Sequence, residues 1–444
     1  MKRFIFLLAL AFLSVTAFSQ YDWQALPSAP TTEYRFDDVY FLNPKIGWAV
    51  KPIGGAVHLG QIWETRNGGN TWALNHDSSQ TYYRCVGFID SLHGWIGNLG
   101  DTSISNDTIP LYYTHDGGKH LIPVNLPSPR PKGICGISIA SDSVIYAYGR
   151  YFSPPVLCMT KDAGKTWVTK DMSAYASVGL IDGWFWSKDT GFITGQDSSN
   201  AVILHTTDGG NTWTTVYHAH RNDSDHVWKM VFPSRDTGYG ALEVIKSKIT
   251  NTYFVKTTDG GKTWTEYPFI YGYDEEGVGF INDTVGWIGG WSGLSFITTN
   301  GGSTWKLDSS FGVMTIGQPY PEPYMNRFRK FGDTLMYGAG NTIYKLDTRI
   351  TGINGIKNSK SFLTNYPNPF IGETTIAYIL QRPCRNVTLQ VTDVTGKKIL
   401  FKNLGMESVG QHTYTLTDKL PAGTYTCTLV TSDAVLNRKI VVVK

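Results

Sequence analysis

Apolar and polar residues alternate over short segments up to Asp347, and this period of two is typical of half-buried β-strands. Two examples are DVYF at 38–41 and VGFI at 278–281. Each is followed by a second apolar segment in which glycine precedes an aromatic residue, as in IGWAV at 46–50 and VGWIGG at 285–290. The pattern therefore predicts pairs of short strands throughout this region.

The second segment of each pair carries an aromatic residue, and the seven such residues are spaced by 46 to 51 positions. This spacing is typical of one four-stranded propeller blade. The expected fold class is therefore all-β, with a seven-bladed β-propeller over residues 20–348 followed by a small β-sandwich. The seven aromatic residues are Trp48, Trp95, Tyr146, Phe192, Tyr239, Trp287 and Tyr337.

An eight-residue phrase, Thr-x-Asp/Asn-x-Gly-x-Thr-Trp, recurs six times at spacings of 41 to 51 residues. The second copy, THDGGKHL at 114–121, lacks the final Thr-Trp. In every copy, the acidic or amide side chain is expected to accept hydrogen bonds from backbone N–H groups two residues on, and the glycines are expected to supply positive φ. A turn repeated around a ring predicts a structural role for Asn67, Asp116, Asp162, Asp208, Asp259 and Asn300.

The seventh blade lacks a copy of this phrase. Its second strand lies in LMYGAG at 335–340, and only one further strand follows before the pattern ends. Residues 21–26 have the same character as the segments that follow each phrase. We therefore predict that the N-terminal strand completes the last blade beside residues 342–347, which also removes an exposed strand edge.

The phrase resembles the Asp-box of the sialidase and BNR-repeat propellers. Combined with the glycine–aromatic strand, the blade resembles the photosystem II stability/assembly-factor family, which implies a non-enzymatic propeller that binds proteins. The resemblance to sialidases implies an arginine cluster, an Asp acid and a Tyr nucleophile, but the Arg-Ile-Pro start of that family is absent, and sialidases have six blades. Xyloglucanase-like propellers place their cleft between two propellers, whereas this chain has one.

The N-terminus predicts export. Residues 1–19 contain Lys2 and Arg3, then an apolar run ending at Phe18, with a small-x-small cleavage pattern before Gln20. No other apolar segment suggests a membrane span in the mature chain. The formal net charge of +3 is too small and too dispersed to indicate a nucleic-acid partner.

The chain after residue 348 has a different pattern. Residues 349–364 are polar and predict a linker, and residues 365–444 contain alternating strands that predict the β-sandwich. The YPNPF opening at 366–370 and the PAGTY turn at 421–425 resemble the C-terminal sorting domain of type IX secretion substrates in the Bacteroidetes group. This resemblance implies the type IX machinery as a partner and a secreted or outer cell-surface location. Spacing alone leaves a disulfide between the two cysteines of this region open.

Three long loops that lead into the fifth, sixth and seventh inner strands contain the candidate binding residues, because such loops gather on one face of a propeller. Aromatic and imidazole rings there suit contact with a protein or a glycan. The candidate ligand-binding residues are Tyr217, His218, His220, Tyr267, Tyr271, Tyr273, Tyr320 and Tyr324.

The first of these loops also has a mixture of ligand types that could hold Zn²⁺ or Ca²⁺. A solvated polar loop is the alternative, and we expect no cofactor elsewhere. The candidate metal ligands are His218, His220, Asp223, Asp225 and His226.

No motif pairs a nucleophile with a base. The sequence therefore predicts a secreted or cell-surface propeller that acts as a non-catalytic binding or scaffolding module for a protein or a glycan. A glycoside hydrolase of the sialidase-like or xyloglucanase-like type is the alternative hypothesis.

Overall fold

The computed structural model describes residues 21–52, 60–100, 106–151, 154–244, 253–269, 274–311, 323–348, 363–366, 368–380, 384–408, 410–417, 420–431 and 435–443. The chain divides into two compact units, Met1–Asp347 and Thr348–Lys444. The predicted signal peptide at 1–19 and most of the predicted linker at 349–364 lie outside the described residues.

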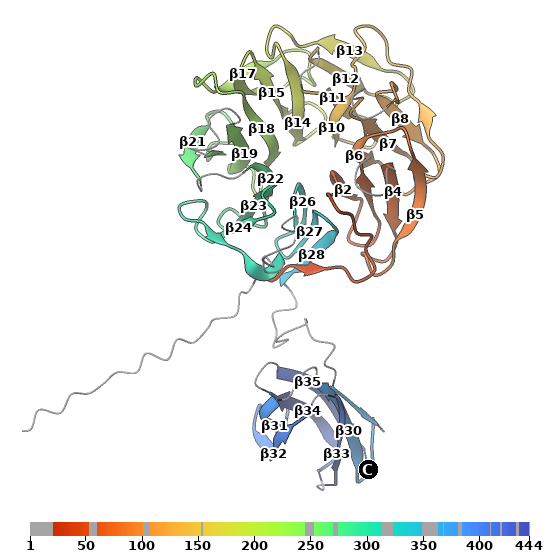
Figure 1. Cartoon of the computed structure of the whole chain (residues 1–444), viewed down its shortest axis with the longest axis vertical. Coiled ribbons are helices and arrows are strands. Elements are labelled where there is room, and N and C mark those ends of the chain that lie inside the picture. The colour runs from red at the N-terminus through yellow and green to blue at the C-terminus, as the bar shows by residue number, and fades with distance from the viewer. Residues whose placement is uncertain are drawn as a thin grey trace, which may run out of the picture. The chain divides into compact units, whose positions relative to one another are not determined.

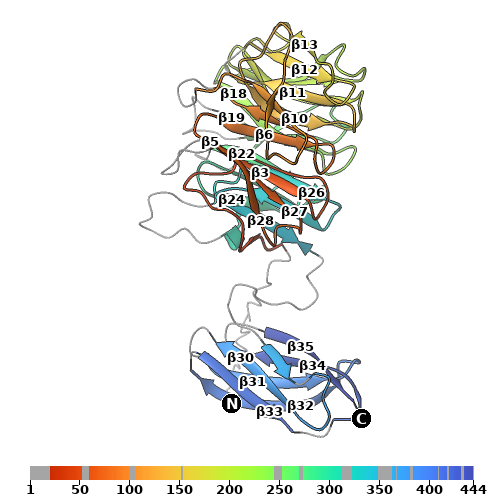
Figure 2. The same cartoon turned by 90° about the vertical axis from the view of Figure 1, so that its right-hand side faces the viewer.

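The described part of the first unit forms seven four-stranded antiparallel sheets around a ring, one for each predicted blade (Figures 1 and 2). The first four blades are β2 (Asp38–Phe41), β3 (Gly47–Lys51), β4 (Gly60–Thr65) and β5 (Ala73–Ser78); β6 (Tyr83–Phe88), β7 (Gly94–Asn98), β8 (Leu111–Thr114) and β9 (Ile122–Pro123); β10 (Ile134–Ile139), β11 (Ile145–Gly149), β12 (Val156–Thr160) and β13 (Val168–Asp171); and β14 (Gly179–Phe185), β15 (Gly191–Asp197), β16 (Asn200–Thr206) and β17 (Thr214–His218).

The next two blades and a short 3-10 helix follow. They are β18 (Asp225–Val231), β19 (Gly238–Val244), β20 (Tyr253–Thr257) and β21 (Thr265–Pro268); then β22 (Glu275–Phe280), β23 (Gly286–Gly290), β24 (Ser295–Thr298) and β25 (Lys306–Leu307); and the helix η1 (Ser309–Phe311).

The last blade combines both ends of the propeller, as predicted. It consists of β26 (Arg327–Phe331), β27 (Leu335–Ala339), β28 (Ile343–Asp347) and the N-terminal β1 (Gln24–Ala25). Gln24 pairs with Lys345 and Ala25 with Tyr344. The neighbouring Trp23 is buried against Trp287, with ring centroids 5.4 Å apart. This pairing closes the ring with the N-terminal strand.

Stacked aromatic rings join consecutive blades, which explains the repeated glycine–aromatic pair. Tyr337 of the last blade stacks on Phe41 of the first at 3.7 Å, and Trp48 of the first stacks on Phe88 of the second at 3.6 Å. Phe41 lies across the backbone of Gly47, where a Cβ atom would come within 2.5 Å of its ring. In the five blades that have it, glycine before the aromatic residue therefore lets the phenylalanine of the inner strand lie flat between blades.

The repeated phrase forms the same turn in each copy, but its hydrogen bonds differ from the prediction. Asp208 accepts a bond from the backbone N–H of Thr212, four residues on at 2.9 Å, and not from a residue two positions on. The two-residue contact is made by Thr206, whose hydroxyl accepts the N–H of Asp208 and that of Gly210. The acidic or amide side chains thus staple the turn, which agrees with a structural role.

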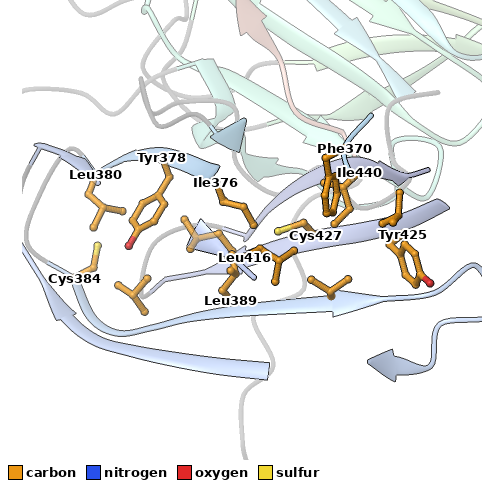
Figure 3. Packing of buried hydrophobic residues seen from close by; sticks show 14 residues of the cluster. Phe370, Ile376, Tyr378, Leu380, Cys384, Leu389, Leu416, Tyr425, Cys427 and Ile440 are labelled. Carbon is orange, nitrogen blue, oxygen red and sulfur yellow. The ribbon is translucent and has the colours of Figure 1, made fainter. Parts of the chain in front are cut away.

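The second unit is a two-sheet β-sandwich. One sheet has the order β29 (Leu363–Tyr366), β30 (Thr374–Leu380), β33 (Gly410–Leu416), and the other the order β32 (Lys398–Glu407), β31 (Cys384–Thr392), β34 (Gly423–Val430), β35 (Val435–Val442). Buried side chains from both sheets fill the space between them (Figure 3). The two cysteines of this unit, Cys384 and Cys427, are buried and do not form a disulfide.

Residues of the YPNPF opening form hydrogen bonds with the last strand of this sandwich. Phe370 donates its N–H to Val441 and accepts the N–H of Val443, each at 3.0 Å. The side chain of Asn368 donates to the carbonyl of Lys439 and accepts from the N–H of Val441. Residues 368–370 therefore cover the outer edge of β35, the last strand of the chain.

Candidate binding surface at the ring axis

The inner strands of the seven blades are β2, β6, β10, β14, β18, β22 and β26, and all of them begin on the same face of the ring because each blade repeats one meander. We call this the top face. The loops that lead into the inner strands and the turns that follow the second strands both lie there. The described candidate ligand-binding residues, Tyr217, His218, His220, Tyr267 and Tyr324, belong to strands or loops next to this face.

Buried ion pairs tie the starts of the inner strands together. Arg35 donates to Asp37 at 2.9 Å and pairs with Glu276 of the sixth blade at 2.8 Å. Arg84 of the second blade pairs with the other oxygen of Asp37 at 3.0 Å. All four side chains are at most 5% exposed. Three blades thus share one cluster at the axis.

A second cluster crosses the ring. Arg327 of the seventh blade donates two hydrogen bonds to Asp182 of the fourth, at 2.9 and 3.0 Å. Its Nε also pairs with Asp38 at 3.1 Å, and Asp38 has a longer contact of 3.4 Å with Arg329. Paired, planar guanidinium–carboxylate contacts of this kind are strong and directional.

These contacts decide the protonation of the axial carboxyl groups. Burial by itself raises the pKa of Asp37, but the guanidinium groups of Arg84 and Arg35 outweigh it and lower the pKa. Burial also opposes ionisation of Asp182 and Glu276, and the positive charges of Arg327 and Arg35 respectively lower the pKa of each. All three are charged at neutral pH, which suits fixed ion pairs and not proton donors.

Trp291 covers this axial cluster on the top face. The guanidinium of Arg35 lies 3.8 Å from the centre of its indole ring, and 38% of Trp291 remains exposed. The turn that carries it is fixed: the N–H of Trp291 donates to the carbonyl of Asp274, and a Cβ at Gly290 would come within 1.7 Å of that carbonyl. The surface therefore presents a large aromatic ring in one position.

The predicted loop of the fourth and fifth blades divides into a buried and an exposed part. The hydroxyl of Tyr217 donates to Glu266 at 2.5 Å, so this residue joins two blades. Arg221 pairs with Glu266 and with Asp225, at 3.0 Å for the latter. His218 and His220 stack with ring centroids 5.0 Å apart, and His220 is exposed. Of these predicted residues, the two histidines offer a surface to a ligand.

The five candidate metal ligands do not converge. Asp225 pairs with Arg221, and burial raises its pKa to about 6 despite that partner. His226 is fully buried, stacks on Trp228 at 4.8 Å, and burial lowers its pKa to about 4. Among the described residues, which include Asp223 and both loop histidines, no group of three His, Cys, Asp or Glu side chains could hold a metal ion. The geometry gives no support to the Zn²⁺ or Ca²⁺ hypothesis.

The remaining candidates are dispersed. Tyr267 is 42% exposed on β21, where it stacks on Phe254. Tyr324 is 5% exposed, and the centre of its ring lies 6.0 Å from the centre of the Trp291 ring. Tyr271, Tyr273 and Tyr320 lie outside the described residues.

Sequence reasoning missed Trp291 because it follows the regular GWIGG strand directly. The signal was its setting, GGWSG, since a large aromatic residue stands where a turn calls for small or polar ones.

Comparison with known families identifies the second unit. Residues 364–443 match the family described as a secretion system C-terminal sorting domain. The protein is secreted or displayed at the cell surface. The sorting domain also implies the type IX secretion machinery as a partner, as its sequence suggested. In the described part of the chain, no helix is long and apolar enough to span a membrane.

Comparison with solved structures supports the propeller. "YCF48 bound to D1 peptide" is 16% identical, with a TM-score of 0.53 over 74% of this chain and 97% of that chain. PorZ, a surface component of the type IX system of Porphyromonas gingivalis, is 12% identical, with a TM-score of 0.50 over 92% of this chain and 59% of that one.

An ancestral GH74 enzyme is also 12% identical, with a TM-score of 0.51 over 94% of this chain and 63% of that one. At these identities the similarity concerns the fold alone. The search of curated proteins gave no match.

Proposed function

We propose that the exported propeller is a non-catalytic binding or scaffolding module that holds a protein or a glycan on its top face. The observation that carries this proposal is Trp291, a fixed and exposed indole at the ring axis. An aromatic ring held in place provides contact area with little loss of side-chain freedom on binding, and such residues dominate interface energetics. His218 and His220 extend the proposed surface toward the fourth blade.

The axial charges support binding over catalysis. Asp37, Asp182 and Glu276 are each held by arginine, and the pKa of each is lowered. A glycosidase needs one carboxyl group that stays protonated to donate to the leaving oxygen. One residue favours the alternative: Asp225, with a pKa of about 6, lies in the range of a general acid. Its ion pair with Arg221 opposes that role.

The proposal is tested with the mature protein on a glycan array and a peptide array, comparing Trp291→Ala with wild type. We expect about tenfold weaker binding, the effect of losing one aromatic anchor, and an unchanged melting temperature. Leu74→Ala is the matched control, because Leu74 is 42% exposed on β5, an outer strand. Equal binding by wild type and Trp291→Ala would contradict the proposal that the ligand binds on the top face.

A further inference from the structure

The two edges of the larger sheet of the sorting domain differ in a way that indicates a partner. Residues 368–370 bond to the backbone of β35 and cover that edge. At the opposite end of the sheet order stands β32, which pairs with β31 on one side only, and no other described segment joins it in a sheet. β32 spans Lys398–Glu407 and is the longest strand of the domain. Long uncovered edges are templates for strand addition.

Several of the exposed side chains of β32 are apolar. Leu400 and Leu404 pack against the core of the sandwich. Phe401 is the neighbour of Leu400 and lies on the outer face, where it is 52% exposed. Ile399 is the extra residue at a register shift between Leu400 and Lys398, and it is 39% exposed. Met406, near the end of the strand, is 70% exposed.

Polar side chains occupy the neighbouring positions of this outer face. Gln390 of β31 stands opposite Phe401, and Thr426 of β34 stands opposite Thr392. Ile399 and Phe401 are therefore exposed apolar side chains at the rim of the sheet, next to polar neighbours. A strand added beside β32 would place its own alternate side chains against both of them, as cross-strand pairs.

The positive charge of this edge favours an acidic partner over a second copy of the chain. Lys397 and Lys398 stand at its start, and the Lys398 ammonium lies 5.1 Å from the centre of the Phe401 ring. Lysine on an edge strand disfavours pairing between identical copies, since like charges approach each other. The same lysines attract a segment that carries carboxylates.

We propose that β32 is the recognition edge of the sorting domain, and that it receives an extended acidic segment of the secretion machinery with alternating apolar side chains. Backbone hydrogen bonds would supply affinity, while Ile399 and Phe401 would select the partner through its side chains. This inference concerns export and is independent of what the propeller binds.

The test uses the full chain in a host with type IX secretion, comparing wild type with the double variant Ile399→Thr/Phe401→Thr. Threonine keeps strand propensity and removes the apolar surface. We expect about tenfold less protein in the medium and on the cell surface, with matching accumulation in the periplasm, as for the loss of two apolar contacts. The melting temperature of the purified double variant should equal that of wild type.

The matched control is Thr413→Lys/Thr415→Lys on β33, the end strand of the smaller sheet, where both threonines are exposed. It should be exported normally. Normal export of the β32 variant, or equal failure of both variants, overturns the proposal. If the purified wild-type chain is a dimer that Phe401→Thr converts to a monomer, the occupant of the edge is a second copy and the proposal is wrong.

If the β32 threonine variant unfolds, Ile399→Glu/Phe401→Glu replaces it and carries the same expectation, because it removes the apolar surface and repels carboxylates. A folded glutamate variant that is exported like wild type contradicts the recognition edge. Export failure leaves the top-face proposal untouched, since binding is measured on purified propeller.

Discussion

Replacing Arg327 with methionine should destabilise the propeller more than any single surface change. Arg327 is 7% exposed and holds Asp182, 3% exposed, by two hydrogen bonds across the ring. Methionine keeps the volume but leaves Asp182 as a buried charge that has lost its guanidinium partner and keeps a hydrogen bond from the N–H of Met230. Breaking a buried pair in this way costs about 3–5 kcal/mol.

The assay is thermal unfolding at neutral pH, where a loss of this size lowers the melting temperature by roughly 6–10 °C at about 2 °C per kcal/mol for a large domain. The control is Arg329→Met, because Arg329 is 25% exposed and reaches Asp38 only at 3.4 Å. We expect that variant to lose no more than about 1 kcal/mol. The double variant Arg327→Met/Asp182→Leu should recover part of the loss, since the buried charge of Asp182 is removed while Asp38 keeps its contact with Arg329.

The pair also predicts a pH dependence. The folded state lowers the pKa of Asp182 below its unfolded value, so the pair stabilises the protein above that unfolded value. This contribution disappears as the pH falls through the folded pKa. The difference between wild type and Arg327→Met should therefore shrink in acid. A variant as stable as wild type at neutral pH would show that the tie across the ring contributes nothing.

Further predictions concern closure, the repeated turn, pH and export. Trp23→Ala should cost about 3–5 kcal/mol in chemical unfolding, as for a buried indole, and an unchanged midpoint would contradict closure by β1. Asn300→Ala removes the bond from the N–H of Thr304 and should cost about 1 kcal/mol without altering ligand binding; lost binding at an unchanged melting temperature would make the turn functional. Between pH 7 and pH 5, the unfolding free energy of His226→Phe should fall by about 2 kcal/mol less than that of wild type. The reason is that the unfolded histidine takes up a proton in this range, whereas the folded one, with a pKa of about 4, does not. An equal fall in both proteins would refute this. Deleting residues 365–444 should retain the propeller in the periplasm, and normal surface amounts would refute the sorting role.

The blades could be predicted because their determinants are local. Each glycine–aromatic pair lies within a few residues of the phenylalanine that needs the space, as Gly47 does to Phe41. The repeated turn is likewise contained in eight residues. Only the predicted hydrogen bonds of the turn were wrong. The hydroxyl of Thr206 accepts the nearer backbone N–H groups, and the carboxylate of Asp208 accepts the N–H of the residue four positions later.

The axial cluster could not be predicted, since its partners meet only when the ring closes. Arg327 and Asp182 are 145 residues apart in sequence. The metal set failed for the opposite reason: proximity in sequence was taken for convergence. Asp225 and His226 begin a buried strand and point to opposite faces of it, while His218 ends the preceding strand and His220 lies in the loop between the two strands.

The most direct test of the proposed function is a turnover assay on the ligand that the mature protein retains in the array experiment, with sialosides and β-glucans included as substrates. We predict retention without product formation, and the same retention by Asp225→Asn. Product release by wild type that Asp225→Asn abolishes, with binding preserved, would contradict a binding module and establish the glycoside hydrolase alternative.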